Sequence, residues 1–167
     1  YSDDSLMLHN DLYQINMAES YWHDGIHERM AVFDLYFRNM PFDSGYAVFN
    51  GLKRVIQFVE NFKFTDSDIA YLASIGYQDD FLEYLKQLRF TGHIHAMQEG
   101  ELCFGNEPML RVEAPLIQAQ LLETELLNII NFHTLIATKA SRIRQVAPND
   151  VLMEFGTRRA QESVSYT

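Results

Sequence analysis

The spacing of apolar side chains along the chain predicts several helices in succession. Residues 10–24 carry apolar side chains at helical spacing, and residues 47–62 repeat the pattern on one face. Shorter helices are predicted over 66–75 and 79–88. Thr65 precedes the first of these as an N-cap residue, and aspartates follow in the first turn, where the helix dipole favours negative charge.

Strand-like segments alternate with these helices. Residues 31–37 are rich in β-branched and aromatic side chains, and residues 91–114 hold short strand-like pieces broken by Gly and Pro turns, which predicts a small antiparallel β module. One very long helix is predicted over residues 116–146. It is apolar on most sides near its middle, so that part is expected to be buried. Residues 151–155 predict a buried strand, which either pairs with 31–37 or begins a larger sheet.

Charge and composition narrow the function classes. The 167 residues include 13 Lys and Arg against 23 Asp and Glu, a net charge of -10, which disfavours nucleic acid as a partner. No apolar run approaches the roughly 18 residues of a membrane span, and residues 1–5 do not resemble a signal peptide. The single cysteine, Cys103, cannot form an intrachain disulfide and is expected to be a buried structural thiol. We therefore expect a cytoplasmic protein.

Two adjacent arginines are the first candidates for chemistry. Arg158 and Arg159 follow the predicted strand 151–155 and a Gly-Thr turn. The guanidinium fork binds carboxylate and phosphate, and the carboxyl ends of strands in an α/β barrel point into the active site. Surface ion pairs in an acidic protein are the competing interpretation, and the pattern by itself favours them slightly.

Asp11 and Tyr13, at the start of the first helix, are the second candidates. Asp11 either caps the helix or holds a polar group of a ligand. Tyr13 lies at helical spacing near the apolar face, which favours a core tyrosine over a ring that stacks on a flat ligand. His93 and His95 lie two residues apart, but no third ligand has suitable spacing, so no metal site is predicted. Structural hydrogen bonds are expected for the polar residues of the long helix, which are Glu123, Asn128, Asn131, His133, Thr134 and Thr138.

Several segments in the same order resemble nicotinate phosphoribosyltransferases, over nearly the whole chain to about residue 162. The matching segments include Asn10–Gln14, Val32–Arg38, Pro41-Phe42, Gly45–Ala47, Phe90–Gly92, Asn106–Pro108, Val112–Leu116, Asn131–Ala140 and Glu154–Gln161. Among the related enzymes, the Thr-Arg-Arg-Ala-Gln run at 157–161 fits the nicotinate-specific branch best.

This resemblance implies an α+β amino-terminal domain over residues 1–147, with the β module at 91–114 and the long helix at 116–146. Residues 148–167 would then be the first strand and turn of an incomplete type II phosphoribosyltransferase α/β barrel. The family joins nicotinate to phosphoribosyl pyrophosphate, forming nicotinate mononucleotide. It hydrolyses ATP through a phosphorylated histidine, normally with Mg²⁺ on the pyrophosphate. Its subunits form a homodimer in which each active site borrows residues from the partner.

The resemblance also assigns roles to single residues. Tyr13 would be the ring-stacking residue lent to the neighbouring subunit, with Asp11 beside it. Phe155 would cover the other face of the pyridine ring, while Arg158 and Arg159 would contact the ligand and its phosphate side. The catalytic histidine loop and most of the barrel are not among the 167 residues. We therefore expect this chain alone to be inactive, and a non-catalytic fragment that serves only as an interaction domain is the alternative.

Overall fold

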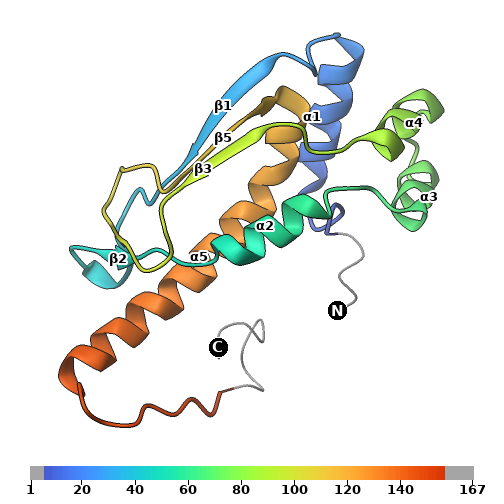
Figure 1. Cartoon of the computed structure of the whole chain (residues 1–167). Helices are drawn as coiled ribbons and strands as arrows, with labels where there is room; N and C mark the ends of the chain where they lie inside the picture. The colour runs from blue at the N-terminus through green and yellow to red at the C-terminus, as the bar shows by residue number, and fades with distance from the viewer. Residues whose placement is uncertain (1–5, 157–167) are drawn as a thin grey trace.

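The computed structural model describes residues 6–156 and has a mixed α/β fold with small antiparallel sheets and one long helix (Figure 1). Each predicted helix forms, and all but the one predicted at 47–62 lie close to their expected bounds. In chain order the elements are α1 (Leu12–His23), β1 (Met30–Leu35), the 3-10 turn η1 (Pro41–Asp43), β2 (Ala47–Val48), α2 (Leu52–Glu60), α3 (Asp66–Ser74), α4 (Asp79–Gln87), β3 (His93–Ala96), β4 (Leu102–Cys103), β5 (Leu110–Pro115) and α5 (Leu116–Val146).

The strands form two sheets, and both join distant parts of the sequence. The larger sheet has the order β1-β5-β3 with antiparallel pairing throughout, and the smaller one pairs β2 with β4. The segment 91–114 is therefore not a β module closed on itself, because β5 lies between β3 and the early strand β1. The alternative in which residues 151–155 pair with the strand predicted at 31–37 is wrong, because β1 pairs with β5 instead.

Alternation along β5 orients the larger sheet. Leu110, Val112 and Ala114 are buried, whereas Arg111 is exposed and Glu113 is half-buried. Successive side chains of a strand point to opposite faces, so the first three face the core and the other two face outward. The inner face lies along the first half of α5, and α1 and α2 also pack against this helix (Figure 1). The middle of α5 is buried on one side only: Leu126, Ile129 and Ile130 are buried, whereas Leu127 and Asn128 are exposed, so its apolar composition overstates its burial.

Helix α2 begins five residues later than the predicted segment 47–62. Gly51 has a φ of +106°, a left-handed conformation that interrupts the helix there. The Glu99 carboxylate accepts hydrogen bonds from the backbone N–H groups of Gly51, at 3.0 Å, and of Lys53, at 3.2 Å. A side chain distant in sequence therefore caps α2. Local periodicity carries no information about such a partner.

Two local predictions are confirmed at the level of single side chains. Thr65 caps α3 in a reciprocal capping box, in which its hydroxyl accepts from the Asp68 N–H and its own N–H donates to the Asp68 carboxylate at 2.7 Å. Cys103 is buried, with its Sγ 3.4 Å from the Ala47 carbonyl oxygen, and burial raises the pKa of the thiol. A buried thiol that resists ionisation is a structural residue.

The strand predicted over residues 151–155 does not form in this structure. Residues 151–156 have neither helix nor strand, and Val151, Met153 and Phe155 are exposed. A strand requires a neighbour to receive its backbone hydrogen bonds, and none of the strands described in residues 6–156 pairs with this segment. The start of an α/β barrel at this place stays a prediction, and the rest of its span, 157–167, lies outside the described residues.

Gly92 lies where the chain enters β3 and passes very close to β5. A Cβ atom at this position would overlap the Ala114 Cβ and lie 2.5 Å from the Glu113 carbonyl oxygen and 2.9 Å from the Ala114 Cα. Because none of these atoms is at the end of a flexible side chain and two belong to the backbone, we expect Gly92→Ala to lower the free energy of unfolding by roughly 1–3 kcal/mol, measured by urea denaturation. Gly45→Ala is the control, since a Cβ there meets nothing within 4 Å. Equal stabilities of the two variants would contradict this interpretation.

Candidate functional site

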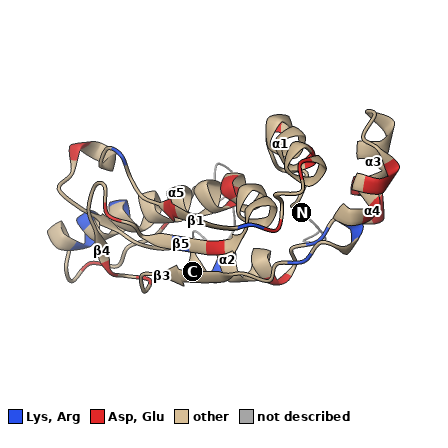
Figure 2. Cartoon of the chain, turned by 90° about the horizontal axis from the view of Figure 1, so that it is seen from above, with Lys and Arg blue, Asp and Glu red and all other residues tan. Residues whose placement is uncertain are grey.

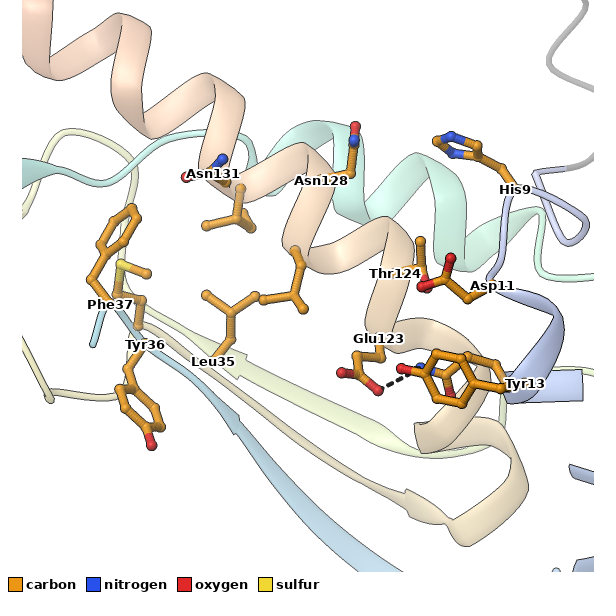
Figure 3. Close-up of a pocket in the computed structure, with 14 residues that line it drawn as sticks. His9, Asp11, Tyr13, Leu35, Tyr36, Phe37, Glu123, Thr124, Asn128 and Asn131 are labelled. Carbon is orange, nitrogen blue, oxygen red and sulfur yellow. Dashed lines mark hydrogen bonds between the residues drawn. The ribbon is translucent and has the colours of Figure 1, made fainter. Parts of the chain in front are cut away.

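A groove of about 430 Å³ runs between the start of α1, the end of β1 and the middle of α5. Figure 3 shows Tyr13, Asp11 and Glu123 at one end of it, and Tyr36 and Phe37 at the other. The fourteen residues that line it are His9, Asp11, Tyr13, Gln14, Leu35, Tyr36, Phe37, Met109, Glu123, Thr124, Leu127, Asn128, Ile130 and Asn131. Two of the predicted site residues, Asp11 and Tyr13, therefore lie together.

Tyr13 is not a core residue. Its side chain is 52% exposed, although it stands on the helix that packs against α5. The default expectation of a buried tyrosine is thus wrong, and an aromatic ring face is available to solvent. Asp11 occupies the N-cap position of α1 but makes no side-chain capping hydrogen bond, so its carboxylate is not engaged in the cap. Both facts are compatible with a role toward a ligand.

Gln14 holds this end of the groove together, and sequence reasoning missed it. Its buried amide donates to the Tyr13 hydroxyl, at 3.0 Å, and to the Glu123 carboxylate, at 2.7 Å, and accepts from Gln120. The only signal in the sequence was its spacing, because Gln14 precedes the buried Ala18 by four residues and so shares its helical face. Leu12, assigned to the apolar face, is exposed instead.

The buried carboxylate of α5 is Glu125. Its side chain is almost inaccessible and is paired with His9 Nδ1 at the start of the described chain. Glu123, for which burial and pairing were considered, is exposed and bonded by Gln14. Side chains two positions apart on a helix point about 200° away from each other, so Glu123 and Glu125 face opposite sides of α5. The amino-terminal segment decides which one is buried.

Structural hydrogen bonding is confirmed for four of the six polar residues of the long helix, since Glu123 accepts from the Gln14 amide. The Thr138 hydroxyl accepts from the Val48 N–H at 2.9 Å, and the Thr134 hydroxyl is 3.2 Å from both the N and the O of Asn50. His133 Nδ1 lies 2.8 Å from a backbone carbonyl one turn earlier on the same helix. The two threonine contacts fasten α5 to β2 and to Asn50, two residues beyond it, whereas the His133 contact lies within α5. Glu123, Asn128 and Asn131 are exposed at the groove.

The groove itself contains no strong cation. No Lys or Arg is among its fourteen residues, whereas Asp11 and Glu123 contribute negative charge. Phe155 does not line it either and is 85% exposed, while Arg158 and Arg159 lie outside the described residues. The groove therefore cannot supply the positive charge that an anionic ligand needs. Cations for such a ligand have to come from elsewhere.

The outer face of the larger sheet carries an ion pair across β1 and β5. Arg111 Nε and Nη2 donate to the two carboxylate oxygens of Asp34 at 2.7 and 2.9 Å. The hydrogen bond from Arg111 holds the pKa of Asp34 below its usual value, against the opposing effect of burial. His95 of β3 lies opposite Arg111 of β5, and His93 of β3 lies opposite Glu113 of β5. Within residues 6–156, no group of three or more His, Cys, Asp or Glu side chains could hold a metal ion.

This pair gives folding a dependence on pH. A carboxyl whose pKa is lower in the folded than in the unfolded state stabilises the fold above the unfolded value of about 3.9, and the contribution is lost as the pH falls through the folded pKa. Asp34→Asn is therefore expected to unfold at a lower temperature than the unmodified chain at pH 6, and this difference is expected to shrink as the pH falls below about 4. Thermal melts across this range test it. Asp24→Asn serves as the control. A difference in melting temperature between Asp34→Asn and the unmodified chain that widens as the pH falls would contradict the stabilising role of the ion pair.

Charged residues of both signs are distributed over residues 6–156. Figure 2 shows Lys and Arg scattered over several elements, with Asp and Glu among them. No described helix has the length and apolar character that crossing a membrane requires.

Solved structures with the same fold identify the class of protein. The chain superposes on human nicotinic acid phosphoribosyltransferase with a TM-score of 0.84 and 38% identity, over 93% of this chain and 32% of that one. Nicotinate-nucleotide pyrophosphorylase from Pyrococcus furiosus shares the fold, with a TM-score of 0.72 at 19% identity, over 98% of this chain and 35% of that one. The fold is thus that of one part of a phosphoribosyltransferase.

Sequence comparison narrows the class to one family. The model of the nicotinate phosphoribosyltransferase (NAPRTase) N-terminal domain matches residues 8–131. Nicotinate phosphoribosyltransferase of Bacillus subtilis is 63% identical over 97% of this chain and 33% of its own length, and nicotinate phosphoribosyltransferase 2 of Arabidopsis thaliana is 46% identical over 91% and 28%. The chain belongs to the nicotinate phosphoribosyltransferase family. It spans about a third of the length of these relatives.

Proposed function

We propose that the protein carrying this chain joins nicotinate to phosphoribosyl pyrophosphate in the salvage of NAD, in the cytoplasm. Family membership supports the activity, and the observation that carries the site is the exposed ring of Tyr13. A tyrosine that is half exposed, yet held at its hydroxyl, presents a flat apolar face in a defined place. Such a face suits a pyridine ring.

In the proposed reaction the pyridine nitrogen of nicotinate attacks C1 of the ribose. The new bond joins this nitrogen to C1, and the bond between C1 and the pyrophosphate oxygen breaks, so that pyrophosphate leaves with the electron pair. Tyr13 would stack on one face of the ring and Phe155 on the other, which orients the nitrogen toward C1. Arg158 and Arg159 would neutralise the ligand carboxylate or phosphate oxygens. Asp11 would bind a polar group beside Tyr13.

A homodimer with a shared site accounts for the charge of the groove. Tyr13 lies among acidic and neutral side chains, so a ligand that is itself an anion requires cations from another surface. In the proposed dimer, the ring of Tyr13 projects into the site of the second subunit, where the arginines lie. The exposed position of Tyr13 permits this geometry, whereas a core position would not.

ATP and Mg²⁺ are proposed as co-substrate and ion of the whole protein. None of the described residues is assigned to their sites: the groove has no Lys or Arg for a triphosphate, and residues 6–156 contain no group of three or more His, Cys, Asp or Glu that could hold a metal ion. The proposed roles of Tyr13, Asp11, Phe155 and the two arginines do not depend on ATP or Mg²⁺. In this proposal the 167 residues alone form only part of the active site and do not catalyse the reaction.

The test is a measurement on the intact protein that contains this sequence. Its mass is determined first, and pyrophosphate release is then measured with phosphoribosyl pyrophosphate, ATP and Mg²⁺, with and without nicotinate. Nicotinate-dependent release supports the proposal. A mass near 19.5 kDa without release would overturn it, and would favour the alternative of a non-catalytic interaction domain. Release from the 167-residue chain by itself would contradict the predicted inactivity.

A further inference from the structure

The amide of Gln14 is buried between α1 and α5 with all of its hydrogen-bonding groups in use. The side chain is 1% exposed. One N–H donates to the Tyr13 hydroxyl and the other to the Glu123 carboxylate, while the carbonyl oxygen accepts from the Gln120 amide. A primary amide has two such donors and one acceptor group, so this side chain is fully satisfied.

Glu123 and Gln120 determine the orientation of this amide. If the amide were turned over, its carbonyl oxygen would face the carboxylate of Glu123 and its NH₂ group would face the NH₂ group of Gln120. Both contacts would be repulsive, and a buried polar group without a partner is costly. The N–H that reaches Tyr13 is therefore held in place by two residues of α5 that do not touch the tyrosine ring.

The contact between Tyr13 and Gln14 is unusual for adjacent residues of a helix. Side chains at i and i+1 project about 100° apart and do not normally face each other. Here the tyrosine lies back across the helix so that its hydroxyl meets the amide at 3.0 Å, while more than half of the side chain remains exposed. The ring is thus held at both ends, by its Cα and by its hydroxyl. An exposed tyrosine without such a contact would exchange among rotamers.

We propose that Gln14 is a positioning residue, which fixes the plane of the Tyr13 ring for stacking against a flat aromatic acid. The inference rests on the proposed function. A ring that is already ordered does not have to be ordered when the ligand binds, which improves affinity without new contacts. Because the ring would contact the ligand equally before and during the reaction, the benefit appears in KM for nicotinate rather than in kcat.

A double-mutant cycle on the intact protein tests this role. Gln14→Leu removes both donors, and Tyr13→Phe removes the acceptor while keeping the ring. Each is expected to raise KM for nicotinate roughly 3- to 10-fold, since one side chain then has to be ordered on binding. KM for phosphoribosyl pyrophosphate and kcat are expected to stay unchanged. The double variant is expected to be no worse than either single variant, because both remove the same hydrogen bond.

Gln118→Leu is the matched control. Gln118 is equally buried on α5, but its amide binds Thr91, away from the groove. Its loss is expected to lower stability without changing KM for nicotinate. Additive effects in the cycle, or an unchanged KM in Tyr13→Phe, would overturn the positioning role; Tyr13→Phe removes a single hydroxyl of an exposed side chain and is informative even if Gln14→Leu fails to fold. Absence of nicotinate-dependent pyrophosphate release in the unmodified protein would instead overturn the proposed function.

Discussion

Replacing Tyr13 by alanine is expected to lower kcat/KM for nicotinate by roughly 5- to 150-fold in the intact protein. Stacking of a flat base on an aromatic side chain contributes about 1–3 kcal/mol, which corresponds to this range. The loss is expected mainly in KM, because the ring would contact the substrate before as well as during the reaction. Steady-state kinetics with nicotinate as the varied substrate measure it.

Stability provides the necessary control for this result. Tyr13 is 52% exposed, so its truncation leaves the core intact and the melting temperature of Tyr13→Ala is expected to stay within a few degrees of the unmodified protein. Tyr71→Ala, on α3, removes a ring of similar exposure that lies away from the groove. If Tyr13→Ala and Tyr71→Ala had the same kcat/KM, the stacking role of Tyr13 would be excluded.

The second large effect is expected at Phe81, which is completely inaccessible in α4. Its ring lies 5.9 Å from Trp22 of α1 and 6.0 Å from Tyr77, so it joins the outlying pair α3 and α4 to the remainder of the domain. Phe81→Ala leaves a cavity at this junction and is expected to lower the free energy of unfolding by about 3–5 kcal/mol.

Urea denaturation of the 167-residue chain, followed by fluorescence, measures this loss directly. Trp22 is the single tryptophan of the sequence and lies against Phe81, so its emission reports on this junction. Phe81→Leu preserves most of the volume and is expected to lose much less. Tyr71→Ala, on the exposed side of α3, is expected to change stability by no more than about 0.5 kcal/mol. A loss below about 1 kcal/mol in Phe81→Ala would show that the junction does not contribute as described.

The sequence predicted only part of the candidate site. Asp11 and Tyr13 could be selected because their segment resembles one family, and the structure places both at one groove. Helical periodicity had assigned Tyr13 to the core, because it could not register that α5 opposes this face of α1 with the polar side chains of Gln120 and Glu123. The same two residues explain why the glutamine next to Tyr13 is buried.

What the sequence by itself determined are features with local causes. The long helix 116–146, the capping box at Thr65 and the buried thiol of Cys103 follow from residues within a few positions of one another, and all three are present. The order of its segments likewise sufficed to indicate the family.

Only the tertiary structure decided which distant segments meet. The pairing of β1 with β5, the late start of α2 under the Glu99 cap and the burial of Glu125 beside His9 each join residues at least 45 positions apart. The segment 151–155 shows the converse, since an apolar run forms no strand where no partner strand lies beside it. Strand pairing and burial depend on the partner as much as on the residue, and local spacing contains no information about the partner.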